Sequence, residues 1–367
     1  MADTDLTAEQ QKLRDDAQAT FRRVQFALQM KHPDQALRML TPLLDRLQKS
    51  AQEEPDCLPD RLDFTDPAQA YLYLNAHPDV DPNAVKPTVA PYTDAYGIHS
   101  ALLYALGRYE DAAAAIDNAL RFNTADAGLY LERAMSHEAM GDFDAVERDI
   151  EAAWPLIIIA TDLARYHAFR ANVLVTQGKY ELAAAHYAVY EDFDPDDVYA
   201  DPHAELHELA HASGRGHRLA HLSSAEAAQR LKRAGENYGP SKLAVDTMQE
   251  LLNDTLNAGK FDDARYVVAG LWAITHFDGW KTLLDKLDEL ASLSADERRD
   301  RANAFLAKAA QDEKDGDTNA YRCSQRRAGC GAARQKRSDR GRVSCKLHAE
   351  EVPPALAHGR HLRVPSA

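Results

Sequence analysis

A short motif of glycine, one variable residue and an aromatic residue recurs along this chain of 367 residues. Its three clearest copies begin at Gly107, Gly141 and Gly178, so the copies are 34 and 37 residues apart. A period in this range is typical of stacked helical hairpins, in which each hairpin buries its apolar face against the next one. The repeat therefore predicts an all-α array of about five to seven hairpins rather than a single closed domain.

The residues around each copy explain why a hairpin is expected there. Glycine adopts the positive φ that ends the first helix, the aromatic residue covers the turn, and a small residue lets the second helix pack closely. The residues five positions after the three glycines are Ala112, Val146 and Ala183. Helical hairpins are therefore expected throughout residues 92–195.

The repeated positions resemble the tetratricopeptide repeat (TPR), a helix–turn–helix unit of 34 residues. The matching residues are Tyr96, Leu103, Gly107, Tyr109, Ala112, Ile116 and Ala119 in the first copy, Tyr130, Ala134, Gly141, Phe143, Val146, Ile150 and Ala153 in the second, and His167, Ala171, Leu174, Gly178, Tyr180, Ala183, Tyr187 and Pro195 in the third. The first two copies depart from the family in lacking its terminal proline, because Thr124 and Ile158 stand there. The resemblance implies a TPR-like α-solenoid, a right-handed superhelix of helical hairpins, and the function of a protein-binding scaffold.

Weaker patterns extend this organisation in both directions. A further copy of the motif begins at Gly259, and apolar stripes at helical spacing lie near both ends of the chain. The expected segments are a degenerate N-terminal hairpin (1–50), a proline-rich connection with a short helix (51–91), and an array over 92–310 made of clear repeats (92–195), a weak repeat (196–235), another repeat (241–275) and capping helices (280–310), followed by a disordered basic tail (311–367).

The composition changes abruptly at Tyr321. From there on the chain has 11 Lys+Arg against 3 Asp+Glu, whereas residues 1–320 have 32 against 55. This acidic body disfavours nucleic acid as the main partner, because nucleic-acid binding depends on cations that neutralise phosphates; only the tail could bind it. The tail also contains four possible zinc ligands, but they lack a close C-x2-C pair. These ligands are Cys323, Cys330, Cys345 and His348. Four interpretations of the tail stay open: a disordered extension, a basic nucleic-acid arm, a zinc knuckle and a shifted reading frame.

The sequence shows neither the pattern of a membrane-spanning helix nor that of a secretory signal. No apolar run reaches the roughly 18 residues of a membrane span, and the first residues lack the basic start and apolar centre of a secretory signal. Apart from Cys57, the cysteines all lie in the tail, so no disulfide framework is expected in the body. These features predict a cytoplasmic protein with no membrane partner.

One string in the weak repeat argues for an enzyme instead. Residues 207–217 read H-E-x-x-H-x-x-G-x-x-H, which resembles the complete zinc-binding motif of the metzincin metalloproteases. The resemblance implies that His207, His211 and His217 hold zinc while Glu208 activates the bound water. Zinc-dependent peptide hydrolysis is therefore the alternative function, with zinc as its cofactor.

Three features of the sequence weaken this alternative. Gly214 of the string lies 36 residues after Gly178, where the repeat already requires a glycine. Five histidines occur within 19 residues, which raises the odds of a chance match. Helical repeats also precede the string, whereas metzincins resemble one another in placing a sheet there. We therefore expect a protein that is not an enzyme and has no cofactor.

The TPR resemblance also implies which residues face a partner. In that family the first helix of each hairpin lines a concave groove. Carried onto this chain, the groove residues are Asp94, Tyr104, Leu131, Glu132, Met135, Glu138, Arg165, Phe169, Asn172 and Thr176. This mixed, centrally acidic surface predicts a protein or peptide partner that is basic or amphipathic, held by apolar contacts. Two alternatives stay open: several of these residues merely solvate the inner face, and the chain forms a homo-oligomer.

Overall fold

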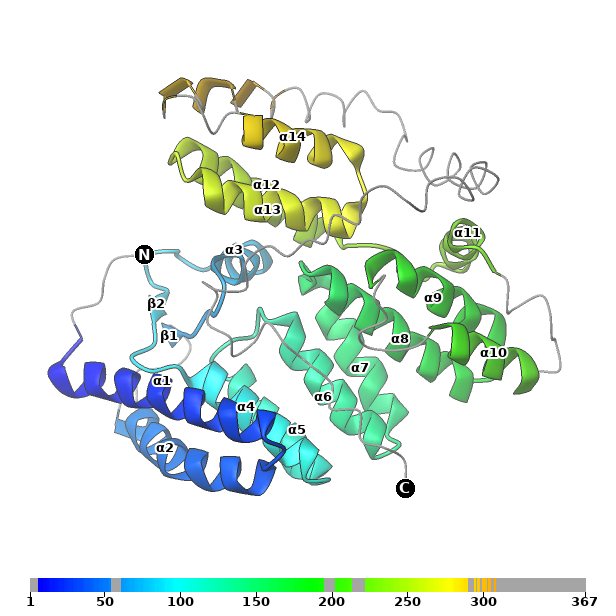
Figure 1. Cartoon of the computed structure of the whole chain (residues 1–367). Helices are drawn as coiled ribbons and strands as arrows, with labels where there is room; N and C mark the ends of the chain where they lie inside the picture. The colour runs from blue at the N-terminus through cyan, green and yellow to red at the C-terminus, as the bar shows by residue number, and fades with distance from the viewer. Residues whose placement is uncertain are drawn as a thin grey trace. The chain divides into compact units, whose positions relative to one another are not determined.

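The computed structural model describes residues 6–53, 61–194, 202–212 and 222–289, together with isolated positions between 294 and 307. Nearly all of the secondary structure in these residues is helical (Figure 1), so the all-α prediction is confirmed. The strands within them, β1 (Arg61–Leu62) and β2 (Lys86–Pro87), are short and pair in parallel. The chain divides into two compact units between Leu156 and Ile157.

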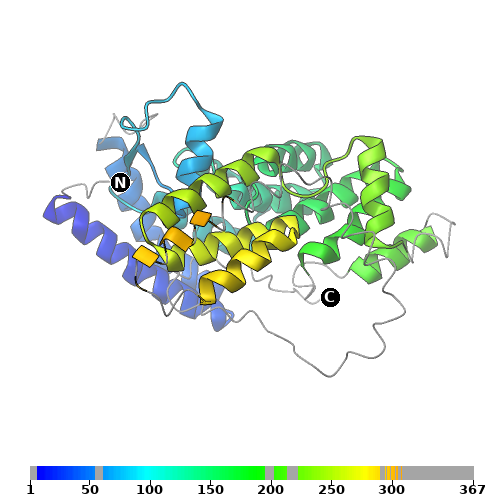
Figure 2. The same ribbon diagram turned by 90° about the horizontal axis from the view of Figure 1, so that it is seen from above.

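The first unit is built from consecutive helical hairpins. Its helices are α1 (Ala8–Gln29), α2 (Pro33–Glu53), α3 (Pro67–Ala76), α4 (Tyr92–Ala105), α5 (Tyr109–Leu120), α6 (Ala127–Ala139), α7 (Phe143–Ala153) and the short 3-10 helix η2 (Trp154–Leu156). Helix α1 packs on α2, α4 packs on both α2 and α5, and α6 packs on both α5 and α7. The hairpins α4–α5 and α6–α7 therefore lie side by side (Figures 1 and 2). The helices expected within residues 7–50 correspond to α1 and α2.

Apolar stripes at helical spacing hold the first hairpin together. Phe21 and Val24 of α1 are buried with Leu40 and Leu47 of α2 in one core cluster. Each fully buried aliphatic or aromatic side chain contributes roughly 1.5–3 kcal/mol relative to an exposed one. Packing of these faces, more than intrinsic helix propensity, stabilises both helices.

The proline-rich connection between α2 and α4 is tied to the helices around it. The Arg14 guanidinium of α1 donates to the carbonyl oxygens of Thr88 and Val89 at 2.7 and 2.9 Å. The Asn123 amide donates to Gln69 Oε1 of α3 at 2.7 Å, and both side chains are buried. Polar contacts of this kind replace the regular backbone pairing that prolines prevent.

The second unit is also helical throughout its described residues. Its helices are α8 (Ala160–Thr176), α9 (Tyr180–Phe193), α10 (Pro202–Ala212), α11 (Ser224–Ala234), α12 (Lys242–Asn257), α13 (Phe261–Thr275) and α14 (Asp278–Glu289). Helix α9 packs on α8, α10 and α11, and α13 packs on α12, α14 and α8. Ala183, Ala184 and Ala185 of α9 are completely buried. Their small side chains let the neighbouring helices approach α9 closely.

The repeat glycines all adopt the conformation that the sequence requires. Gly107, Gly141, Gly178 and Gly259 follow α4, α6, α8 and α12 with φ of 73°, 76°, 70° and 72°, which confirms the predicted positive φ. In every case the residue after the glycine donates its N–H to the carbonyl five residues before it, at 2.9 or 3.0 Å. This bond and the left-handed glycine form a Schellman cap. Gly214 lies outside the described residues.

Two turns of the second unit differ from expectation. Gly235 ends α11 with φ of 74° and the same type of backbone bond, from Glu236 N to the Leu231 carbonyl at 2.9 Å. No aromatic residue follows this glycine at the motif position, so the repeat pattern did not identify the turn. Helix α14 begins at Asp278, two residues before the predicted capping region of 280–310, because α13 ends at Thr275 and is capped by His276. The second expected capping helix lies outside the continuously described residues.

Candidate functional site

The predicted groove residues divide between the two units. Asp94 and Tyr104 lie on α4, Leu131, Glu132, Met135 and Glu138 lie on α6, and Arg165, Phe169, Asn172 and Thr176 lie on α8. The residues of α4 and α6 belong to neighbouring hairpins of the first unit. The candidate site is therefore built from α4 and α6.

Tyr104 is the aromatic centre of this face. Its ring packs on Tyr109 with the ring centres 5.1 Å apart, at the turn that Gly107 forms. Burial raises the pKa of the Tyr104 hydroxyl, and the neighbouring Tyr109 and the negative charges of Glu138 and Glu132 raise it further. The two carboxylates therefore lie close enough to the phenol ring to act on it electrostatically. The result is an apolar surface flanked by negative charge.

Tyr104, Glu132, Met135 and Glu138 are all half-buried. A half-buried side chain is fixed by its neighbours but still presents part of its surface to a partner. Charges in such positions interact more strongly with a ligand than fully solvated ones, because the local dielectric is lower. The face combines an aromatic ring, a thioether and two carboxylates, a set that suits a cationic side chain beside an apolar one.

A second acidic group lies at the N-terminal ends of α4 and α6. Burial raises the pKa of Asp94 to about 7, and the negative charges of Asp63 and Asp126 add to the effect. Asp126 Oδ1 accepts the backbone N–H of Gly128 at 2.9 Å and so caps α6, while Asp63 Oδ2 accepts that of Thr93 at 2.6 Å. Near neutral pH, Asp94 therefore exchanges between its charged and neutral forms. Sequence reasoning identified Asp94 but missed Asp63 and Asp126.

Leu131, Phe169 and Arg165 do not belong to an open surface, which corrects the groove predicted from the family positions. Leu131 and Phe169 have 0% exposure, and Arg165 is buried beside Asp162 with 3.3 Å between Arg165 Nη1 and Asp162 Oδ1. Leu131 follows Ala127 and precedes Ala134 in the apolar stripe of α6 that faces the core. These side chains stabilise their helices and cannot contact a partner.

The other two residues of α8 differ in exposure. Asn172 is half-buried and its Oδ1 accepts the hydroxyl of Tyr187 on the paired helix α9. Thr176 is exposed at the last turn of α8, and its hydroxyl donates to the Val173 carbonyl at 2.7 Å. Both side chains form hydrogen bonds within their own hairpin.

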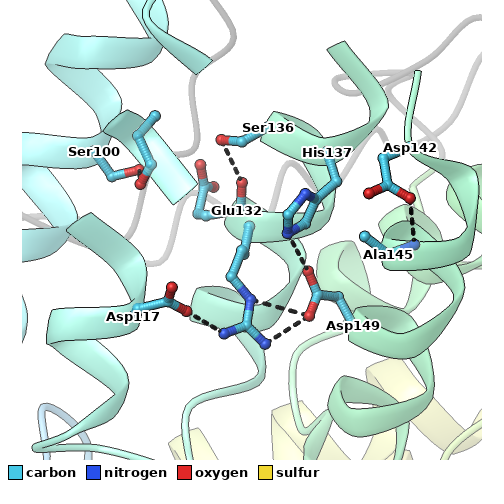
Figure 3. A network of polar contacts seen from close by, with 10 residues as sticks. Ser100, Asp117, Glu132, Ser136, His137, Asp142, Ala145 and Asp149 are labelled. Carbon is cyan, nitrogen blue, oxygen red and sulfur yellow. Dashed lines mark hydrogen bonds and ion pairs between the residues drawn. The ribbon is translucent and has the colours of Figure 1, made fainter. Parts of the chain in front are cut away.

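A partly buried ion-pair network fixes the orientation of α6, with Asp149 buried and Asp117 exposed. The Arg133 guanidinium donates to Asp149 Oδ1 of α7 at 2.6 and 3.0 Å and to Asp117 Oδ1 of α5 at 2.5 Å (Figure 3). His137 Nε2 lies 3.7 Å from the second oxygen of Asp149. One side chain of α6 thus joins three helices. We name Arg133, Asp117 and Asp149 the arginine clamp.

The arginine clamp was missed by sequence reasoning, although the repeat offers a signal for it. Arg133 and Asp149 stand eight residues before and eight residues after Gly141. Opposite charges at mirrored positions on the two helices of a hairpin can meet across it. The clamp holds α6, and with it the neighbouring Glu132 and Met135, in a fixed register.

The corresponding positions around Gly178 are Arg170 and His186, and they are satisfied differently. The Arg170 guanidinium binds both oxygens of Glu236, at 2.9 and 3.0 Å, just beyond the turn that ends α11. Hydrogen bonding from His186 and Arg170 lowers the pKa of Glu236 to about 2. Arg170 therefore finds its carboxylate outside its own hairpin.

His186 instead faces another histidine. Its Nδ1 lies 2.8 Å from Nδ1 of His167, and both rings are completely buried. One ring must carry a proton at Nδ1 and the other must accept it there, so at least the accepting ring is neutral. Burial lowers the pKa of both imidazoles. We name His167 and His186 the histidine pair.

The residues of the metzincin-like string lie on and after α10. His207 and Glu208 are exposed on this helix, and His211 is on the same helix. His217 lies outside the described residues, as do the tail cysteines. Within the part of the chain that the structure describes, no group of three His, Cys, Asp or Glu residues could hold a metal ion. No described geometry therefore supports hydrolysis at Glu208.

The comparisons with known proteins add no family or activity to this geometry. Within the described ranges, no helix is both long and apolar enough to cross a bilayer. The resemblance to the TPR rests on the residues of the repeat and on the turns that they form. Neither a protein-family model nor a curated protein sequence matches the chain.

Proposed function

We propose that the chain is a TPR-like α-solenoid that acts as a protein-binding scaffold. In this proposal the face of α4 and α6 binds a basic, amphipathic segment of a partner protein. The observation that carries it is the position of Tyr104, half-buried beside the negative charges of Glu132 and Glu138. An aromatic anchor flanked by fixed charges is a common centre of a protein interface.

The chemistry of the face determines what it selects. Tyr104 and Met135 offer apolar area to an aliphatic or aromatic side chain of the partner. A lysine or arginine beside that side chain would meet Glu132 and Glu138, and could also lie over the Tyr104 ring. An acidic segment would bring like charges together, which costs several kcal/mol across an interface.

Rigidity of the face supports the same function. The arginine clamp ties α6 to α5 and α7. The Schellman caps at Gly107 and Gly141 fix the ends of α4 and α6. A preorganised surface binds with less loss of conformational entropy than a mobile one, so affinity is gained without additional contacts.

The proposal is tested by selecting random 12-residue peptides from a display library on the full-length protein. Enriched peptides should combine Lys or Arg with aromatic or large aliphatic residues. Tyr104→Ala, Glu132→Lys and Glu138→Lys should each weaken binding by about tenfold, the effect of one interfacial hot spot. Glu151→Lys on α7 is the matched control, because Glu151 is exposed and has the same charge.

Two results would contradict the proposal. Enriched peptides that bind equally well to wild type and to all three variants would place the site elsewhere. An equal loss of affinity in Glu151→Lys would show that the acidic body attracts basic peptides through its general field, not through this face.

A further inference from the structure

The outer face of the first helix carries an apolar stripe that the fold does not cover. Phe26 of α1 and Met30, the residue that caps the end of α1, are 64% and 55% exposed. They are spaced by four residues, so they lie on one side of the helix. Terminal helices of repeat arrays usually present a polar outer face to solvent, and this one does not.

This stripe forms one wall of a groove. A concavity of about 840 Å³ lies between α1 and the start of α2. Residues that define it include Arg22, Arg23, Phe26, Met30, His32 and Met39. Two antiparallel helices with an apolar channel between them offer a seat for a third helix that presents an apolar face.

The rim of the groove is positively charged. Arg23 donates to the Ala19 carbonyl and to Thr20 Oγ1, and neither it nor Arg22 meets a carboxylate within the described residues. Both arginines are exposed. This rim contrasts with the body of the chain, where residues 1–320 have 55 Asp+Glu against 32 Lys+Arg.

The charge of the rim decides between possible occupants. A twofold interface with a second copy would bring Arg22 and Arg23 of each copy close to those of the other, which is repulsive. The segment 321–367 of the same chain has 11 Lys+Arg against 3 Asp+Glu, so the rim repels it as well. An acidic helix from a different protein satisfies both the apolar channel and the rim.

We propose that the α1–α2 groove binds an acidic amphipathic helix of a partner protein. The apolar side chains of that helix pack on Phe26, Met30 and Met39, and its carboxylates pair with Arg22 and Arg23. The groove is a second binding surface, separate from the face of α4 and α6 and opposite to it in charge preference. The chain can therefore join two partners of different chemistry.

The proposal is tested by selecting helical peptides from a library in which the charge of the peptide is not fixed. A display library of 18-residue helices fixes an apolar stripe and randomises every other position. It is selected on the full-length chain, and peptides that also bind the Phe26→Ala/Met30→Ala variant are removed. We expect the surviving peptides to be rich in Asp and Glu, and to bind more weakly at high salt.

Charge reversal on the rim provides the decisive comparison. Arg22→Glu/Arg23→Glu should weaken the selected peptides by at least tenfold, whereas Arg38→Glu on α2, an exposed arginine outside the groove, should leave affinity unchanged. All of the substituted side chains are exposed, so the variants should keep the wild-type melting temperature. Arg22→Glu/Arg23→Glu leaves the apolar stripe intact and tests the rim by itself.

Three outcomes overturn the proposal. The first is that no peptide survives removal by the Phe26→Ala/Met30→Ala variant. The second is that the survivors are neutral or basic. The third is concentration-dependent self-association of the wild type that this variant abolishes, measured by analytical ultracentrifugation, because a second copy would then occupy the groove.

Discussion

Arg133 and Asp149 in the first unit stand at the same repeat positions as Arg170 and His186 in the second, yet their polar contacts differ. In the first unit, the arginine meets a carboxylate on the second helix of its own hairpin. In the second unit, a histidine replaces that carboxylate, and the arginine pairs with Glu236 beyond α11. The glycine turns of the two hairpins are nevertheless alike.

This comparison separates two kinds of information in a repeat. The glycine and the small residues set the backbone of the hairpin, and they do so equally in both units. The buried polar residues are free to vary as long as every charge finds a partner. His186 stands at the position of Asp149 and pairs with His167 instead of with an arginine. The stability of this histidine pair depends on pH.

The largest effect should come from breaking the arginine clamp. Arg133→Met leaves Asp149 buried without its main partner, so we expect the free energy of unfolding to fall by about 3 kcal/mol in urea titrations. Arg108→Met, which removes the exposed pair with Asp111, should cost less than about 1 kcal/mol. Equal losses in the two variants would show that the clamp is not structurally important.

The histidine pair should make the second unit sensitive to acid. Burial keeps the pKa of both rings below the value of about 6.5 found in unfolded chains, so their contribution is complete above that pH and is lost as pH falls below it. Hydrogen exchange of α8 and α9 should show a loss of about 2 kcal/mol between pH 7 and 5, with little change in α6 and α7. The contribution of Glu236, whose folded pKa is about 2, is complete above the ordinary pKa of 4.5 and is lost only below it, so it does not change in this window.

Removing both histidines sharpens that test. His167→Phe/His186→Gln cannot titrate between pH 7 and 5, so the acid sensitivity of α8 and α9 should disappear. The glutamine amide can still donate to Glu236, which retains its pairing with Arg170. Persistence of the acid sensitivity in this variant would mean that other groups cause it.

Asp94 should give the first unit the opposite pH response. Its folded pKa of about 7 lies above the ordinary value of 3.8, so its ionisation destabilises the fold increasingly as pH rises from 4 towards 7. Asp94→Asn should therefore stabilise the protein by about 1–2 kcal/mol at pH 8, a modest gain because solvent screening reduces the electrostatic effect. Near pH 3 the substitution should have no effect, because Asp94 is then protonated in both the folded and the unfolded chain. Thermal unfolding at the two pH values checks both signs, and destabilisation at pH 8 would contradict this account.

The smallest effect should be common to both units. A Cβ at Gly141 or Gly178 would meet no atom within 4 Å, so only the positive φ opposes alanine. Gly141→Ala and Gly178→Ala should each cost about 1 kcal/mol by chemical denaturation. A difference well above 1 kcal/mol between them would show that the two hairpins do not share the same turn energetics.

The backbone was more predictable from sequence than the polar contacts. Local signals, such as the glycine that needs positive φ and the apolar stripe of each helix, located α4 to α9, α12 and α13. The turn at Gly235 lacks the aromatic residue that marks the others, so it escaped notice, and so did the partner that Glu236 provides for Arg170. Contacts between residues far apart in sequence carry no local signal.

The candidate site was predictable only in part for the same reason. Helical spacing distinguishes the faces of α6, but the face assigned from family positions included Leu131, which the packing of α6 turns to the core. The acidic environment of Asp94 depends on Asp63, which the proline-rich connection brings to α4. No periodicity within the repeat indicates that placement.

Mapping a bound peptide onto the chain tests the scaffold proposal most directly. A basic peptide from the 12-residue selection, carrying a photoreactive group beside its apolar residue, is cross-linked to the full-length protein, and the attachment point is located by mass spectrometry. This account predicts attachment at Tyr104 or Met135, abolished by Glu132→Lys and retained in Glu151→Lys. Attachment outside α4 and α6, or attachment that survives Glu132→Lys, would contradict it.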